Sequence, residues 1–108
     1  MSSGQPPAYG ATLGEIMGTM DADGFSGQMA ARPGGMLLCF TCRQESPAAE
    51  FEVQAQRRTE GASDPADMLA ILGLRCPRCQ ARGTAVLGYG PEADADDADA
   101  LVQLGVRG

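Results

Sequence analysis

Four cysteines in two close pairs constrain this chain more than any other feature. Cys39 and Cys42 form one Cys-x-x-Cys pair, Cys76 and Cys79 form the second, and the 108-residue sequence has no other cysteine. Two such pairs are the usual spacing of a closed four-thiolate zinc site, which leaves no coordination position for water or substrate. We therefore predict one structural Zn2+ per chain, held by all four cysteines.

Two other uses of the paired cysteines stay open. A redox pair needs the motif after a strand and at the N-terminus of a helix, where the helix dipole lowers the thiol pKa. Pro47 follows the first pair closely, and residues 80–89 read as a turn and a strand, so neither pair meets that requirement. A rubredoxin-like iron site uses similar turns, but Arg43 and Gln80 stand where that family has glycine. Zinc is the favoured interpretation.

Histidine is absent from the sequence. Its absence removes the usual general base, the Ser-His-Asp and Cys-His catalytic arrangements, and every mixed Cys/His metal site. The net charge of -6 repels phosphate backbones and disfavours general nucleic-acid binding. Because no set of residues resembles a catalytic centre, we predict a protein that is not an enzyme.

The beginning of the sequence and its hydropathy bear on location. "MSSGQPPAYG" lacks the basic start and apolar stretch of a signal peptide, and no apolar run is long enough to span a membrane. We expect a cytoplasmic protein with no membrane partner, in a reducing compartment that favours metal ligation over disulfides. Residues 1–10 are expected to be a disordered tail, and residues 11–106 a single zinc-stabilised domain.

The first part of the chain predicts a helix followed by two short strands. In "ATLGEIMGTMDADGF" the apolar residues recur with a helical period, Thr12 is placed to cap the helix, and Gly24 is placed to end it in a left-handed conformation. The period then changes, and "FSGQMAARPGGMLLC" reads as two strands. Pro33 and Gly34 suit the central positions of a type II turn between them.

The second part predicts three further strands and a helix. Residues 50–58 alternate in polarity, which would place Phe51, Val53 and Ala55 on one face of a half-exposed strand. The remaining expected elements are strands over residues 67–75 and 83–89, and a C-terminal helix that opens at Pro91 with an acidic run.

Alternating strand directions bring the two cysteine pairs together. In a meander, the strand that ends at Cys39 and the strand that ends near Cys76 run the same way, so both pairs reach the same end of the sheet. We predict an α+β fold: a four- to five-stranded antiparallel sheet with an N-terminal and a C-terminal helix, and a zinc ribbon-like site of four cysteines at one end of the sheet.

Two resemblances follow from these motifs. Residues 38–89, with their two cysteine hairpins, resemble the zinc ribbon class. "RRTEGASDPADMLAI" and "GTAVLGYGPEADADDADAL", which lie between Arg57 and Leu101, look like a family of small, functionally uncharacterised bacterial proteins, some of which carry the automatic label phosphoribosylpyrophosphate synthetase. Other members lack the cysteines, so the resemblance implies that the sheet is the older element and the metal site an addition.

The enzyme label of that family finds no support in the residues. A phosphoribosyl enzyme needs a loop that cradles phosphates together with magnesium. "EGASDPAD" offers Asp64 and Asp67 but no Gly-Lys or Gly-Thr run at the start of a helix. We expect these carboxylates to cap a turn, and we expect no catalytic or cofactor-binding residues apart from the metal ligands.

Half of the chain's positive charge flanks the cysteine pairs, in Arg43, Arg75, Arg78 and Arg82. These arginines either offset the charge of a thiolate cluster or form a small basic tip that touches nucleic acid. We predict a noncatalytic zinc-binding domain that serves as a protein-binding or adaptor module. The alternatives are a transcription-associated zinc ribbon that contacts nucleic acid through these arginines, and a rubredoxin-like or thiol redox protein.

Overall fold

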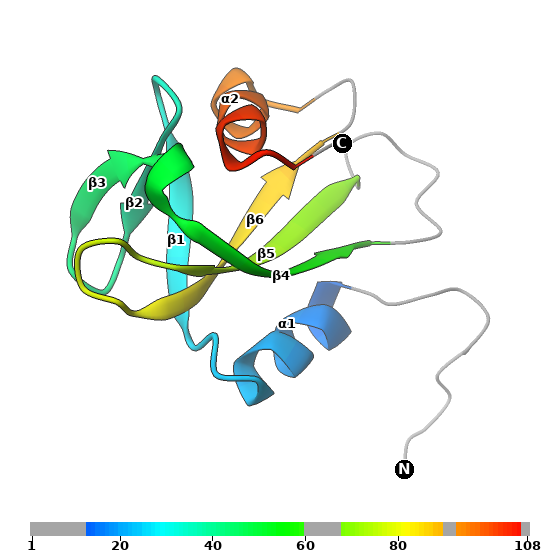
Figure 1. Ribbon diagram of the computed structural model, residues 1–108. Helices are drawn as coiled ribbons and strands as arrows, with labels where there is room; N and C mark the ends of the chain where they lie inside the picture. Colours follow the sequence, from blue (N-terminus) through cyan, green and yellow to red (C-terminus); the bar gives the residue numbers. More distant parts are fainter. Residues whose placement is uncertain (1–12, 60–67, 90–92, 107–108) are drawn as a thin grey trace, which may run out of the picture.

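The computed structural model describes residues 13–59, 68–89 and 93–106 (Figure 1). The expected tail, the Thr12 cap, the "EGASDPAD" turn and the helix start at Pro91 lie outside these residues. The elements, in chain order, are α1 (Leu13–Ala22), β1 (Gly27–Arg32), β2 (Met36–Cys39), β3 (Gln44–Pro47), the 3-10 helix η2 (Ala48–Glu50), β4 (Glu52–Arg58), β5 (Leu69–Arg75), β6 (Arg82–Gly88) and α2 (Ala95–Leu104).

The strands form one six-stranded sheet in the order β3-β2-β1-β6-β5-β4. Neighbouring strands are antiparallel except at the centre, where β1 and β6 run parallel. The α+β class is confirmed, but the prediction of four or five antiparallel strands is wrong in number and direction. The added strand β3 is the short, mostly polar "QESP", which has no apolar alternation to reveal it. The parallel pair joins segments far apart in sequence, and the periodicity of apolar residues does not identify the partner of a strand.

A close backbone approach marks the parallel pair at the centre of the sheet. Gly27 and Gly83 lie opposite each other in the register. A Cβ atom added to Gly83 would lie 2.6 Å from the carbonyl carbon of Gly27 and 2.7 Å from its oxygen. Only glycine therefore fits at position 83, because any other side chain would push the two central strands apart.

Helix α1 covers one face of the sheet (Figure 1), where Ile16, Met20, Phe25 and Ile71 form a small core. The helix ends at Ala22, and Gly24, with a φ of +99°, takes the expected left-handed conformation just beyond it. The Phe25 N–H donates to the Met20 carbonyl at 3.0 Å, a bond typical of a Schellman cap. The cap places Phe25 beneath the helix and over the sheet, where a Cβ on Gly73 would lie 2.8 Å from its ring.

Helix α2 covers the opposite face, which carries the main core (Figure 1). Its first turn holds the acidic residues Asp96 and Asp97, as the sequence indicated. The Asp97 carboxylate accepts the Gly88 N–H at 3.0 Å and so fixes the helix to the end of β6. Neither helix of the described residues has the length and apolar character needed to cross a membrane. Buried side chains of the main core are Met29, Leu37, Cys39, Ala48, Phe51, Ala70, Leu72, Leu74, Cys76, Ala85, Leu87, Ala100 and Leu101.

Strand β4 departs from the predicted alternation. Its pairing with β5 shifts register between Val53 and Ala55, a β-bulge that leaves Gln54 as the extra residue. Val53 therefore packs on the main core with Phe51, whereas Ala55 packs on the α1 side. The expectation that all three share one face is wrong, because an inserted residue reverses the alternation beyond it.

Candidate metal centre

Each cysteine pair lies at a turn between two adjacent antiparallel strands: Cys39 is the last residue of β2, and Cys76 directly follows β5. The first turn connects β2 to β3, and the second connects β5 to β6. Strands β2 and β5 run in the same direction, because each is antiparallel to one member of the parallel β1–β6 pair. Both turns therefore reach the same end of the sheet, as the alternation of strands predicted.

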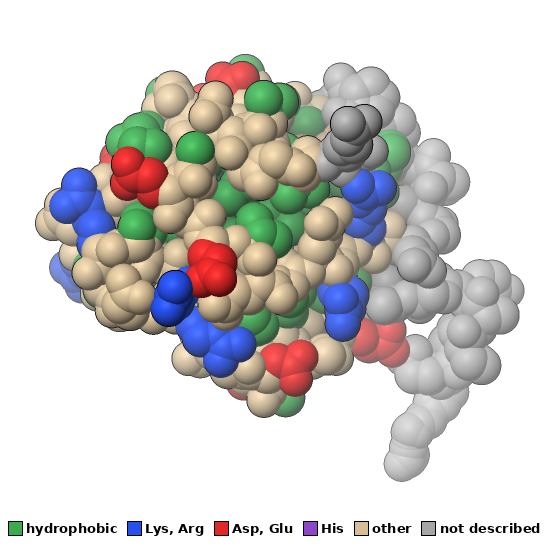
Figure 2. Space-filling view, in the orientation of Figure 1, with side chains coloured by type: hydrophobic (Ala, Val, Ile, Leu, Met, Phe, Trp, Pro, Cys, Tyr) green, Lys and Arg blue, Asp and Glu red, His purple; other side chains and the backbone are tan. Residues whose placement is uncertain are grey.

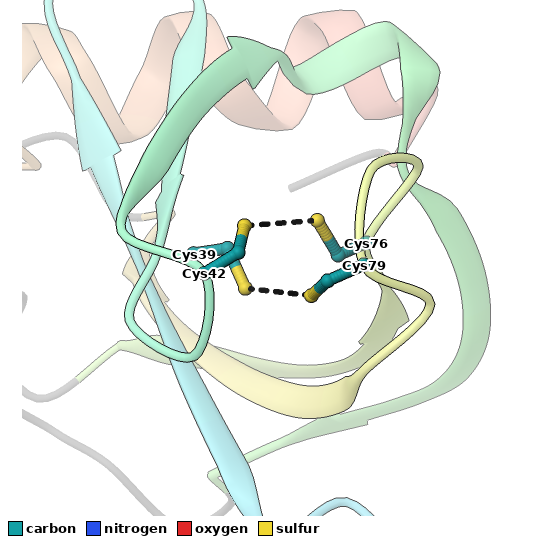
Figure 3. A group of neighbouring side chains, drawn as sticks. All are labelled: Cys39, Cys42, Cys76 and Cys79. Carbon is teal, nitrogen blue, oxygen red and sulfur yellow. Dashed lines mark hydrogen bonds between the residues drawn. The ribbon is translucent and has the colours of Figure 1, made fainter.

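The four sulfur atoms meet between these turns (Figure 3). All four lie within 4.8 Å of one another. The Sγ atoms of Cys39 and Cys79 are 3.8 Å apart, and those of Cys42 and Cys76 are 3.9 Å apart. A tetrahedral ion with metal–sulfur bonds of about 2.3 Å has neighbouring sulfurs about 3.8 Å apart. The donor set therefore fits a metal ion, and all four predicted ligands are brought together.

The centre continues the main hydrophobic core. The Cys39 and Cys76 residues are 0% and 1% exposed, and both are members of that core. Cys42 and Cys79 are partly exposed and pack against its end. A metal ion held here is shielded by protein on the core side and lies nearest to solvent beside Cys42 and Cys79.

Burial, backbone N–H groups and neighbouring thiols shift the pKa values of Cys39 and Cys42. Burial raises the pKa of Cys39, but the N–H groups of Cys42 and Thr41 and the thiol of Cys79 stabilise its thiolate, so its pKa is lowered overall. Burial has the largest effect on Cys42 and raises its pKa, against the opposing N–H of Gln44.

The surroundings of Cys79 shift the pKa of its thiol strongly. The Ala81 N–H stabilises its thiolate, but burial and the three neighbouring cysteines together raise the pKa of Cys79 to about 12. Neighbouring sulfurs cannot all carry negative charge unless a cation compensates them. A divalent ion that binds thiolates supplies this compensation.

The two turns share an unusual backbone conformation after their second cysteine. Arg43 and Gln80 have φ values of +61° and +66°, in the left-handed region that favours glycine. The Arg43 N–H donates to the Cys39 carbonyl at 2.7 Å, and the Gln80 N–H donates to the Cys76 carbonyl at 3.1 Å. Each hydrogen bond closes its turn around the cysteine pair, and the side chains at positions 43 and 80 are held in a strained conformation.

Relief of this strain gives a first prediction. Replacing Gln80 or Arg43 by glycine is expected to stabilise the metal-loaded protein by about 1 kcal/mol each, because the left-handed conformation costs a side chain roughly that amount. Chemical denaturation followed by circular dichroism measures the change. Gln80→Ala is the matched control, since it keeps Cβ and should give no gain. Glycine variants no more stable than this control would contradict the prediction.

The structure separates the four arginines that flank the cysteines. Arg75 pairs with Glu52 at 2.8 Å. The Arg82 guanidinium lies 4.3 Å from the centroid of the Phe25 ring, on the α1 side of the sheet and away from the sulfurs. Only Arg43 and Arg78 belong to the cysteine turns. Figure 2 shows basic side chains at the left edge of the molecule, where Figure 1 places these turns.

Sequence reasoning missed Ser46, which lies on β3 and is 1% exposed. Its hydroxyl accepts a hydrogen bond from the Nε of Arg78 at 2.6 Å. No signal in the sequence indicated this residue, because β3 itself was not recognised as a strand.

Comparison with family models, with curated proteins and with solved structures found no match to this chain. The fold and the site define the class on their own: an α+β protein with a four-cysteine cluster that can hold a metal ion.

Proposed function

We propose that this chain is a noncatalytic zinc-binding domain whose four-cysteine site holds one structural Zn2+. The carrying observation is the sulfur geometry, in which four thiols from two turns lie within 4.8 Å of one another. Four protein ligands complete a tetrahedron, so the bound ion has no position for water or substrate. The role of such an ion is to hold the two turns together and to cover the end of the core.

Zinc is preferred to iron or disulfide chemistry for this site. A closed site of four thiolates is typical of structural zinc, and Arg43 and Gln80 occupy the left-handed positions at which rubredoxin-like iron sites have glycine. A reducing cytoplasm would keep the cysteines available as ligands. The rival redox role would require the same four cysteines to hold iron or to cycle through disulfides.

A protein partner is preferred to nucleic acid. Phe40 is 50% exposed and Val86 is 37% exposed. Both residues line the same depression of about 340 Å³ beside β1 and β6, which presents apolar side chains to a protein partner. The nucleic-acid alternative loses support because two of its four arginines have partners within the protein. Arg75 forms an ion pair with Glu52, and the Arg82 guanidinium stacks on the Phe25 ring.

Metal content and partner capture test the two parts of this proposal. Full-length protein from cells grown with both zinc and iron should be colourless and contain one zinc per chain. A red, iron-loaded preparation would favour the redox alternative. Tagged wild-type protein should capture a protein partner that a Phe40→Ser variant with the same zinc content does not capture. Equal capture by both variants would contradict a contact at this surface.

A further inference from the structure

Arg78 contacts both halves of the metal centre. It lies between Cys76 and Cys79 in the second turn, and its backbone N–H donates to the Cys76 sulfur at 3.4 Å. Its side chain reaches the other hairpin, where the Nε donates to the Ser46 hydroxyl at 2.6 Å. Arg78 therefore donates one hydrogen bond to a ligand sulfur through its backbone and one to the opposite hairpin through its side chain.

Ser46 lies where its hydroxyl can accept this hydrogen bond from Arg78. It is paired with Leu37 across the β2–β3 ladder, two positions along from the pair of Cys39 and Gln44. Residues two apart on a strand share a face, so Ser46 lies on the same side of the sheet as the Cys39 sulfur. Its side chain is buried, and a buried hydroxyl requires a hydrogen-bond partner, which Arg78 provides.

The sheet ladder does not join the two turns directly. Strands β2 and β5 are separated by β1 and β6, so the turns meet only because the sheet curves around the cluster (Figure 3). The Arg78–Ser46 hydrogen bond joins the two hairpins without passing through sulfur. It also brings a positive charge to the turn that holds two of the ligands, and hydrogen bonds from charged donors are stronger than those between neutral groups.

We propose that Arg78 is a positioning residue of the metal centre: its hydrogen bond to Ser46 holds the second cysteine turn against the β2–β3 hairpin and slows release of the metal ion. This inference rests on the proposed zinc site. Release requires a competing ligand to reach the ion from the solvent side, beside Cys42 and Cys79, while one turn moves away from the other. Arg78 opposes that movement.

The first test measures how fast zinc leaves the loaded full-length chain when excess EDTA is added. Arg78→Met and Ser46→Ala are each expected to release zinc about tenfold faster, the order expected for loss of one hydrogen bond to a charged group. The double variant should be no faster than either single variant, because both remove the same bond. Arg75→Met is the control, since its ion pair lies on the α1 side, and its rate should stay within about twofold of wild type.

Two results of this kinetic test would contradict a role for Arg78 in holding the metal ion. A wild-type rate in Arg78→Met would overturn the inference. A double variant whose acceleration is the product of the two single effects would also overturn it, because the two residues would then act independently. Each variant should still bind one zinc per chain. A changed rate of zinc release then reflects a change in how firmly the site retains the ion, and not loss of the site.

A second test measures the hydrogen bond itself and not the release of the metal. In the folded, full-length chain as purified, NMR should find the Arg78 Nε–H exchanging with solvent about tenfold more slowly in wild type than in Ser46→Ala. Equal exchange in the two proteins would overturn the inference, even if zinc binds. Slow exchange in a chain that takes up no zinc would contradict the proposed function and show that the bridge between the hairpins exists without it.

Discussion

Replacing Cys76 by serine is expected to abolish stoichiometric zinc binding and to unfold the domain under conditions in which the wild-type protein is folded. Cys76 is 1% exposed and belongs both to the sulfur cluster and to the main core. Structural zinc sites contribute on the order of 10 kcal/mol of apparent binding energy, which is similar to the whole stability of a small domain. Circular dichroism melting and metal analysis of the same sample measure both losses.

The control for this prediction is Thr41→Ser, a change in the first turn at an exposed position that is not a ligand. This variant should keep its zinc and melt close to wild type. Cys79→Ser, at a partly exposed ligand, should lose zinc as Cys76→Ser does. If Cys76→Ser binds one zinc per chain and melts like the control, the four cysteines do not act as one site.

Replacing Gly83 by alanine is expected to have the second largest effect, a loss of about 3 kcal/mol in the free energy of unfolding. The new Cβ would lie 2.6 Å from the Gly27 carbonyl carbon, and backbone at the centre of a sheet has little room to move. Urea denaturation of the zinc-loaded protein measures the loss. The effect tests the parallel β1–β6 pairing, because no other feature of the fold demands glycine at this position so strictly.

Gly18→Ala is the matched control for this substitution. Gly18 lies inside α1, and a Cβ there would meet no atom within 4 Å. Alanine has the higher helix propensity, so this variant should be more stable than wild type by up to about 1 kcal/mol. If Gly83→Ala unfolds at the same urea concentration as wild type or above it, β1 and β6 do not pair as described.

The four-cysteine cluster could be predicted from the sequence because its determinants are local. Each Cys-x-x-Cys pair fixes two ligands within one turn, and the apolar runs before Cys39 and Cys76 reveal the strands that carry them. Whether the two turns lie at the same end of the sheet depends only on strand direction. The predicted strand directions were correct at this point although the number of strands was wrong, because β2 and β5 run the same way in the six-stranded sheet.

The strand partners could not be predicted, because pairing in a sheet is decided by contacts between distant segments. The parallel β1–β6 pair and the short edge strand β3 follow from such contacts. One signal was available: glycine inside a strand often marks a close backbone approach, and both Gly73 and Gly83 lie in apolar strands. The first accommodates the Phe25 ring, and the second accommodates the backbone of β1.

The arginines show why proximity in sequence is a weak guide to proximity in a sheet. Arg75 is adjacent to Cys76 in the chain, yet neighbouring residues on a strand point to opposite faces. It pairs with Glu52 on the α1 side, whereas the cysteine sulfur lies on the main-core side. Arg78 belongs to the turn itself, and its side chain reaches Ser46.

X-ray absorption at the zinc edge tests the central claim most directly. In the zinc-loaded full-length protein, the account predicts a single shell of four sulfur atoms at about 2.3 Å from the metal, with no nitrogen or oxygen neighbour. A shell with fewer than four sulfurs, completed by lighter atoms, would contradict it, because at least one of Cys39, Cys42, Cys76 and Cys79 would then lie outside the site.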